Sequence, residues 1–216
     1  MPDFLLVNYY FPGFPFPEDF SNEHFSLWLK LPYSFFVLFL IPVYLKHWGI
    51  KNFLWFSDVA LILSVPALWL ESSLLASMLA VGVLLPEIYW NIELFLRLIT
   101  HKPLAGLTDY MFDDSRPLYL RLLSLFHVVL PGILILMLLK LGYDSRAIYY
   151  QTGLACIILL ITYKVTDPSK NINWVFGFGK SPQDKLDSRL FLVLVILAYI
   201  FLLFVPSHFL LDWIFN

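Results

Sequence analysis

Residues 74–99 read LLASMLAVGVLLPEIYWNIELFLRLI, and residues 118–140 read LYLRLLSLFHVVLPGILILMLLK. Both runs are apolar over more than the roughly 20 residues that an α-helix needs to cross a bilayer. Each run nevertheless contains side chains that hydrocarbon solvates poorly, namely Glu87 and Asn91 in the first and His127 in the second. Such side chains usually face the protein interior or a wet cavity. The two runs therefore predict a helical membrane protein with a polar site between two of its spans.

The composition of the whole chain indicates the same class. Of 216 residues, 60% are hydrophobic and only 14% are charged, which is more apolar surface than one soluble domain of this length can bury. The formal net charge of −2 gives no basic footprint for nucleic-acid binding. A single cysteine, Cys156, excludes an intramolecular disulfide and a multi-cysteine metal site. Membrane lipids are thus the expected partners, and a protein partner or a homo-oligomer stays open.

The predicted architecture is an all-α bundle of about six transmembrane spans in a single domain over residues 31–213. The expected spans are residues 31–45, 53–70, 74–99, 118–140, 147–163 and 190–213. Residues 1–30 are rich in aromatic residues and proline and lack the order of a cleaved signal peptide. We therefore expect them to form a retained extracytoplasmic tail at the membrane interface.

Lysine and arginine are concentrated in alternate connections between these spans. The connections that carry most of them are the turn after residue 45 and the two long loops, residues 100–117 and 164–189. The positive-inside rule then places both long loops in the cytoplasm and both termini outside. This predicts a multi-pass protein of the cell membrane, which would be the inner membrane in a bacterium.

Glu87 and Asn91 lie on one predicted stripe of residues 74–99, together with Ala76 and Ala80, because separations of 4 and 7 return to the same face of a helix. One interpretation is a functional pair in which Glu87 orients the imidazole of His127. The other is a protonated acid and a neutral imidazole that hold helices together by hydrogen bonds. A histidine that faces Glu87 or Asp58 would have the acceptor that a general base needs.

Other chemistry finds less support in the pattern. Asp58 follows Ser57 near the start of the second predicted span, where a structural partner such as Asn173 or Lys51 is an equal alternative to a site role. No HxxxH or ExxH pair occurs on one predicted helix, so no metal site is expected. No nucleophile elbow or phosphate-binding glycine loop is present, so no cofactor is expected either.

Three short stretches resemble a loose superfamily of small multi-span membrane proteins. They are FLWFSD at residues 53–58, FHVVLP at 126–131, and NWVF at 173–176 followed by GKSP at 179–182. The superfamily includes the androgen-induced integral-membrane hydrolases, which cleave fatty-acid esters of hydroxy fatty acids with a threonine and a histidine. Its relatives include a phospholipid acyltransferase and bacterial proteins of unknown role.

The resemblance implies that His127 is the family histidine. At the position of the hydrolase threonine this chain has Trp55, which cannot act as a nucleophile. Ser57 is similar in position to the cysteine of the acyltransferase-like branch, so the resemblance makes Ser57 the candidate nucleophile.

Two hypotheses of function follow. The first is a membrane-embedded lipid ester hydrolase or acyltransferase with His127 as general base, Ser57 as nucleophile, and Glu87 or Asp58 as the group that orients the imidazole. Its substrate pocket is expected to include Asn91, Asn173, Trp174 and Cys156, of which Cys156 is a rival nucleophile. The second is a non-enzymatic membrane protein, either an assembly subunit or a lipid or small-molecule binding protein.

Overall fold

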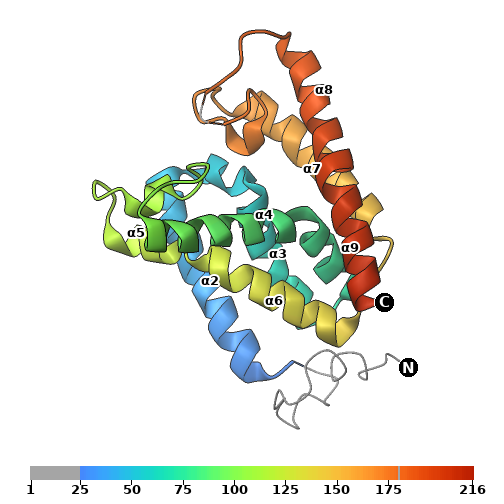
Figure 1. The fold of residues 1–216 in the computed structure, drawn as a ribbon. Helices are drawn as coiled ribbons and strands as arrows, with labels where there is room; N and C mark the ends of the chain where they lie inside the picture. Colours follow the sequence, from blue (N-terminus) through green and yellow to red (C-terminus); the bar gives the residue numbers. More distant parts are fainter. Residues whose placement is uncertain (1–24, 180) are drawn as a thin grey trace.

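The computed structural model describes residues 25–179 and 181–216, and within this part of the chain it contains helices and no strands (Figure 1). The predicted tail of residues 1–30 lies mostly outside the described residues. The α-helices are α2 (Leu27–Trp48), α3 (Phe56–Leu70), α4 (Ser73–Thr100), α5 (Leu118–Leu123), α6 (Phe126–Leu141), α7 (Ala147–Val165), α8 (Ser188–Ala198) and α9 (Val205–Phe215). Short 3₁₀ turns occur at η2 (Ile50–Leu54), η3 (Asp109–Phe112) and η4 (Ile172–Trp174), and η5 (Tyr199–Phe204) is π-helical.

Five helical segments are long and apolar enough to cross a membrane, which confirms the predicted bundle. They are Leu27–Trp48, Ser73–Thr100, Leu118–Leu141, Ala147–Val165 and Ser188–Phe215. The second of the six predicted spans is shorter than expected, because α3 has only 15 residues. At 1.5 Å per residue it is about 22 Å long, against about 30 Å of hydrocarbon. The predicted range 53–70 is divided because Trp55 is extended and separates η2 from α3.

Helix α2 begins four residues before its predicted start, because Ser26 caps it by accepting a hydrogen bond from the backbone N–H of Trp28. Lys30, in the first turn of α2, is buried. Its Nζ lies 2.7 Å from Oε1 of Glu71, at the end of α3. One turn further on, the Tyr33 hydroxyl lies 2.7 Å from the Ser64 hydroxyl. These contacts fix α2 and α3 as an antiparallel pair.

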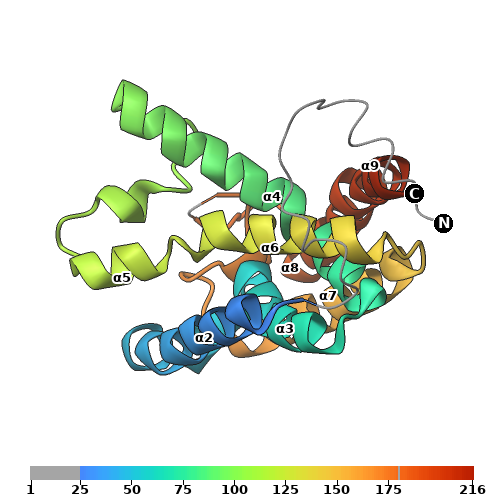
Figure 2. The same ribbon diagram turned by 90° about the horizontal axis from the view of Figure 1, so that it is seen from below.

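Helix α4 is at the centre of the bundle and packs against α3, α6, α7 and α9 (Figures 1 and 2). The face of α4 toward its neighbours carries Ala76 and Ala80, both fully buried, as the small-residue stripe predicts. On α3, Ala60, Ser64 and Ala67 are buried in the same way, while Ser57 is part-exposed. Small side chains let these backbones approach closely where no hydrophobic force draws helices together in lipid.

The last span runs from α8 through η5 to α9 along one edge of the molecule, drawn in red in Figure 1. Pro206 lies at the start of α9 and cannot donate the hydrogen bond that an α-helix would direct to Leu202. The π-helical segment Tyr199–Phe204 ends two residues before this proline. The span therefore continues past the proline with one locally widened turn.

Candidate functional site

The structure brings Glu87 and His127 into direct contact between α4 and α6. Nδ1 of His127 lies 2.7 Å from Oε2 of Glu87. The side chain of Glu87 is 4% exposed and that of His127 is 15% exposed. The pair is thus enclosed on the carboxylate side and open to a small degree on the imidazole side.

Asn91 completes the contact through a backbone group. Pro131 has no N–H, so the carbonyl of His127, four residues before it, lacks its usual helical donor. Nδ2 of Asn91 donates to this carbonyl at 2.6 Å and also to the carbonyl of Glu87 at 2.8 Å. Asn91 therefore joins α4 to α6 at the residue that carries the imidazole, as neighbours often do for the carbonyls freed by proline in membrane helices.

Two aromatic rings lie against the imidazole of His127. The Trp90 ring is stacked at 4.6 Å between centroids with an interplanar angle of 26°, and the Phe126 ring is stacked at 4.0 Å with an angle of 28°. Trp90 comes from the helix of Glu87, one turn on, and Phe126 precedes His127 at the start of α6. The rings restrict the rotation of the imidazole, so that Nδ1 stays directed at Glu87.

Three side chains with hydroxyl groups lie beside the Glu87–His127 pair. The Tyr44 hydroxyl is 2.9 Å from the Ser124 hydroxyl, which also donates to the carbonyl of Leu120 at 3.2 Å. Tyr110, from the loop between α4 and α5, has its ring 6.5 Å from that of Trp90. Burial raises the pKa of the Tyr110 phenol, and the neighbouring Tyr44 raises it further. Tyr44 and Tyr110 thus lie next to Phe126 and Trp90, the two rings that hold the imidazole.

Asp58 lies in the first turn of α3 and makes no described contact with His127. It is 4% exposed, and its Oδ2 accepts from Nδ2 of Asn52 at 3.2 Å, whereas its Oδ1 has no partner among the described residues. Of the two predicted orienting groups, Glu87 is the one that bonds to the imidazole.

The two candidate nucleophiles make no described contact with His127. Ser57 is part-exposed in the first turn of α3, and its hydroxyl forms no hydrogen bond among the described residues. Cys156 is a part-buried free thiol on α7. The resemblance proposes Ser57, and Cys156 is its rival, but the direction of a side chain depends on how its helix is rotated in the bundle.

Asn173, predicted to line the pocket, holds the start of α3. It is 2% exposed, its Oδ1 accepts from the backbone N–H of Phe56 at 3.2 Å, and its Nδ2 donates to the carbonyl of Leu54 at 2.7 Å. Asn173 and Trp174 both have positive φ, of 51° and 58°. The ring of Trp174, 37% exposed, lies edge-on to Phe178 at 6.4 Å. The predicted loop thus packs beside the first turn of α3, two residues from Asp58.

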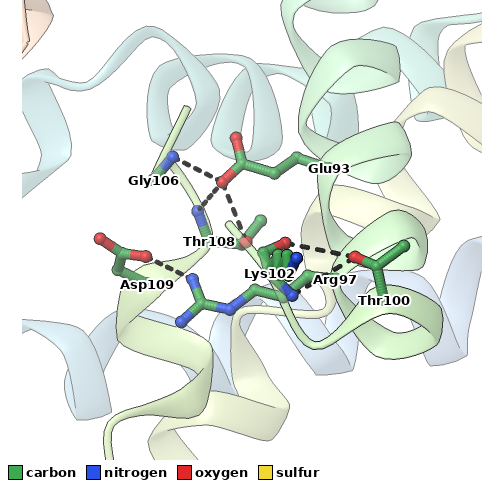
Figure 3. Close-up of polar contacts among 7 residues, drawn as sticks. All are labelled: Glu93, Arg97, Thr100, Lys102, Gly106, Thr108 and Asp109. Carbon is green, nitrogen blue, oxygen red and sulfur yellow. Dashed lines mark hydrogen bonds and ion pairs between the residues drawn. The ribbon is translucent and has the colours of Figure 1, made fainter. Parts of the chain in front are cut away.

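The structure also reveals an acid that sequence reasoning missed. Glu93, on α4, is fully buried, and its Oε1 accepts from the N–H of Gly106 at 2.8 Å, the N–H of Thr108 at 3.3 Å and the hydroxyl of Thr108 at 3.2 Å (Figure 3). Arg97 pairs with Asp109 on the same loop. These contacts hold the loop that carries Tyr110 against the helix that carries Glu87. The signal that could have identified Glu93 is its position as a second acid within the apolar run of residues 74–99.

Within the described residues, no group of three or more His, Cys, Asp and Glu side chains lies close enough together to hold a metal ion. The chain is an integral membrane protein by its long apolar helices, with a buried carboxylate and an imidazole paired between two of them. Comparison of the chain with protein-family models, with curated proteins and with solved structures finds no match in any of the three.

Proposed function

We propose that this protein cleaves or transfers acyl esters of membrane lipids, with His127 as the general base. The observation that carries the proposal is the hydrogen bond of 2.7 Å between Nδ1 of His127 and Oε2 of Glu87. A carboxylate can only accept, so Nδ1 holds the proton and Nε2 keeps its lone pair. This is the base and orienting acid of a nucleophile–base–orienter arrangement.

The chemistry assigned to the pair is proton transfer to and from an acyl centre. A water molecule adds to the ester carbonyl carbon and gives its proton to Nε2 of His127. The ester C–O bond then breaks, and the imidazolium returns the proton to the departing alcohol, which leaves a carboxylic acid. In acyl transfer, a lipid hydroxyl replaces water. Glu87 stabilises the imidazolium, while the Trp90 and Phe126 rings hold its orientation.

Water or a lipid hydroxyl is the attacking group in this proposal because Ser57 has no described contact with His127. The resemblance of residues 53–58, 126–131 and 173–182 to membrane ester hydrolases and acyltransferases supports the same class of substrate. In this arrangement the chain resides in the cell membrane, and the ester approaches from the leaflet next to the two long loops.

The test is ester turnover by purified protein in liposomes that contain acyl esters with a fluorescent or isotopic label. We expect His127→Ala to lower turnover about 10²- to 10⁴-fold, the usual contribution of a positioned acid–base group. Glu87→Gln keeps a hydrogen-bonding side chain but removes the negative charge, so a large loss is expected there too.

The matched control is His208→Ala, because His208 lies on α9, its Nδ1 is 2.7 Å from the Tyr143 hydroxyl, and it makes no described contact with Glu87 or His127. This variant should leave turnover unchanged. Ser57→Ala should also leave it unchanged, and a loss there equal to that of His127→Ala would make Ser57 the nucleophile. Full turnover in a folded His127→Ala protein would disprove the proposal.

A second candidate, a non-enzymatic membrane protein, is favoured by a different observation. Asn91 donates to backbone carbonyls of both α4 and α6, so the polar contacts around Glu87 and His127 also hold these two helices together. Such a protein would be an assembly subunit or a lipid-binding protein, acting with membrane lipids, a partner protein or a second copy. It would show no ester turnover in the wild type, and Glu87→Gln would affect its stability alone.

A further inference from the structure

A cavity of about 160 Å³ lies where α4, α6 and α9 meet, on the side of the membrane toward which α6 and α9 end. Its walls are aliphatic and aromatic, with Ala80 and Leu84 from α4, Ile135 from α6, and Leu211 from α9. The one polar side chain in the lining is that of Ser207. Ser207 is 1% exposed, and its hydroxyl has no hydrogen-bond partner among the described residues.

The floor and the rim of this cavity differ in exposure. Ala80, Leu211 and Leu84 form the floor and are 0%, 3% and 5% exposed. The rim residues Ile88, Leu210 and Ile214 are 38%, 39% and 52% exposed, and they lie on helices that are long and apolar enough to span the bilayer. The cavity is therefore a hollow whose rim is continuous with the surface that faces hydrocarbon.

We propose that this cavity binds the hydrocarbon chain of a membrane lipid. An apolar rim within a membrane span meets hydrocarbon first, and an apolar lining suits a ligand that brings no polar group. An engineered cavity of about 150 Å³ holds benzene, so this cavity accommodates a segment of about six carbon atoms. The proposal does not depend on catalysis at His127, because it concerns occupancy and not turnover.

The chain binds at a defined position relative to the Glu87–His127 pair. Ile88, on the rim, follows Glu87 directly, and Leu84 lies one helical turn before it. Ile135 is two turns beyond His127 on α6, which corresponds to about 12 Å at 1.5 Å per residue. An acyl chain in the cavity thus lies alongside α4. It is displaced from the imidazole by one to two helical turns, toward the start of α4 and the end of α6.

The experiment uses the full chain in liposomes doped with a phosphatidylcholine that carries a photoreactive diazirine in the middle of one acyl chain. After illumination, the adducts are mapped by peptide mass spectrometry. We expect adducts on the floor residues Leu84 and Leu211, which bulk lipid does not reach. Phe35 on α2, which is 72% exposed, reports ordinary contact with the surrounding lipid.

Ser207→Phe fills the cavity and sacrifices no described hydrogen bond. Adducts on the floor residues should fall about tenfold, because the phenyl ring takes up the space of the acyl chain; this corresponds to about 1.4 kcal/mol of lost binding free energy. The adduct at Phe35 should stay unchanged. Leu202→Phe is the matched control, because Leu202 lies on the same span and is 77% exposed. This variant should change neither the adducts on the floor residues nor the adduct at Phe35.

Three results would overturn the proposal. One is a wild-type protein whose adducts occur only on exposed residues. Another is a folded Ser207→Phe protein with undiminished adducts on Leu84 and Leu211. Should this variant fail to fold, Ile135→Phe provides the same test from the α6 wall, where the side chain is only part-buried. The third is a wild-type protein without lipid adducts on the floor, in which a photoreactive amino acid placed at Leu211 crosslinks to a second copy of the chain; that copy, and not a lipid, would then be the occupant.

Discussion

Pro131 determines the environment of His127 without touching its ring. By withholding one N–H, the proline frees the carbonyl of His127, and the side-chain amide of Asn91 binds that carbonyl at 2.6 Å. The imidazole is then held through its own backbone, through Glu87 at Nδ1, and through the stacked Trp90 ring. One missing hydrogen-bond donor in α6 thus explains why an amide is needed on α4.

This link predicts coupling between Asn91 and Pro131. Asn91→Leu should lower the free energy of unfolding by about 1–2 kcal/mol, the value of a hydrogen bond between membrane helices in model peptides. In a Pro131→Ala background, residue 131 can donate to the carbonyl of His127, so Asn91→Leu should cost less there. Unfolding of the four proteins in a mixed micelle gives the coupling energy by a double-mutant cycle. Equal costs in both backgrounds would refute the link.

Part of the site could be predicted from the sequence at this scale. Helical periodicity places Ala76, Ala80 and Glu87 on one face, and the cost of burying an acid in lipid indicates that this face meets a partner. Periodicity cannot show which residues of another helix lie opposite. For that reason the sequence does not indicate Trp90 and Tyr110, and it cannot decide whether the Ser57 hydroxyl faces His127.

At the scale of elements, the start of α3 is fixed by hydrogen bonds from a loop that is distant in sequence. Asn173 accepts from Phe56 and donates to Leu54, so it acts as the helix cap from 117 residues away in sequence. The left-handed backbone at Asn171, Asn173 and Trp174 directs this side chain at the helix start. The sequence predicts a long loop at residues 164–189 but not the helix that it contacts, because a cap supplied by another segment leaves no local signal before the helix.

We predict that Asn173→Ala destabilises the protein by about 1 kcal/mol or more, as the loss of a helix cap usually does. Alanine also tolerates the positive φ of 51° poorly. Asn173→Gly separates the two effects, because glycine adopts this backbone without strain and lacks only the side-chain bonds. The glycine variant should lie between wild type and alanine in thermal melting, and an alanine variant as stable as wild type would contradict the capping role.

The turn between α6 and α7 carries a pH-dependent element outside the spans. Hydrogen bonds from the Arg146 side chain lower the pKa of Asp144 below its usual range, and the Arg146 backbone N–H adds to this. A carboxyl group with a lowered pKa in the folded state stabilises the protein above its unfolded pKa of about 3.9. That stabilisation is lost as the pH falls through the lower, folded value.

Thermal melting of wild type and Asp144→Asn should therefore differ by a constant amount from neutral pH down to about pH 5, and the difference should shrink below about pH 4. Arg146→Gln removes the main donor and should weaken this dependence. Measuring the difference between variants cancels the contribution of Asp113 and Asp167, whose pKa values are lowered in the same direction by Ser115 and Ser169. A difference that stays constant throughout acid pH would exclude Asp144 as the titrating group.

At the scale of the whole molecule, hydropathy predicted the helical bundle because every backbone polar group in lipid must be bonded within its own helix. Five long spans follow from that constraint. The short length of α3 does not follow from this constraint, because the ends of α3 depend on tertiary contacts of Lys30, Glu71 and Asn173. The central position of α4 is likewise a property of packing and not of its own sequence.

Orientation in the membrane is a prediction at this scale. The excess of lysine and arginine places the loop between α4 and α5 in the cytoplasm and the turn between α6 and α7 outside. In a Cys156→Ala background, a cysteine at the exposed Lys102 should react with an impermeant thiol reagent only after the cell membrane is opened. A cysteine at Arg146, also exposed, should react in intact cells. The reverse pattern would invert the topology.

The π-helical segment Tyr199–Phe204 makes the length of the last span adjustable. Bonds from i to i+5 take up one residue more per turn than those of an α-helix, so a single deletion there lets the turn close as α-helix while α8 and α9 keep their rotation. The same deletion in α4 before Glu87 would rotate one half of that helix by about 100° against the other. Insertions and deletions during the divergence of this chain would thus be absorbed in the last span, whereas the central helix must keep its residue count.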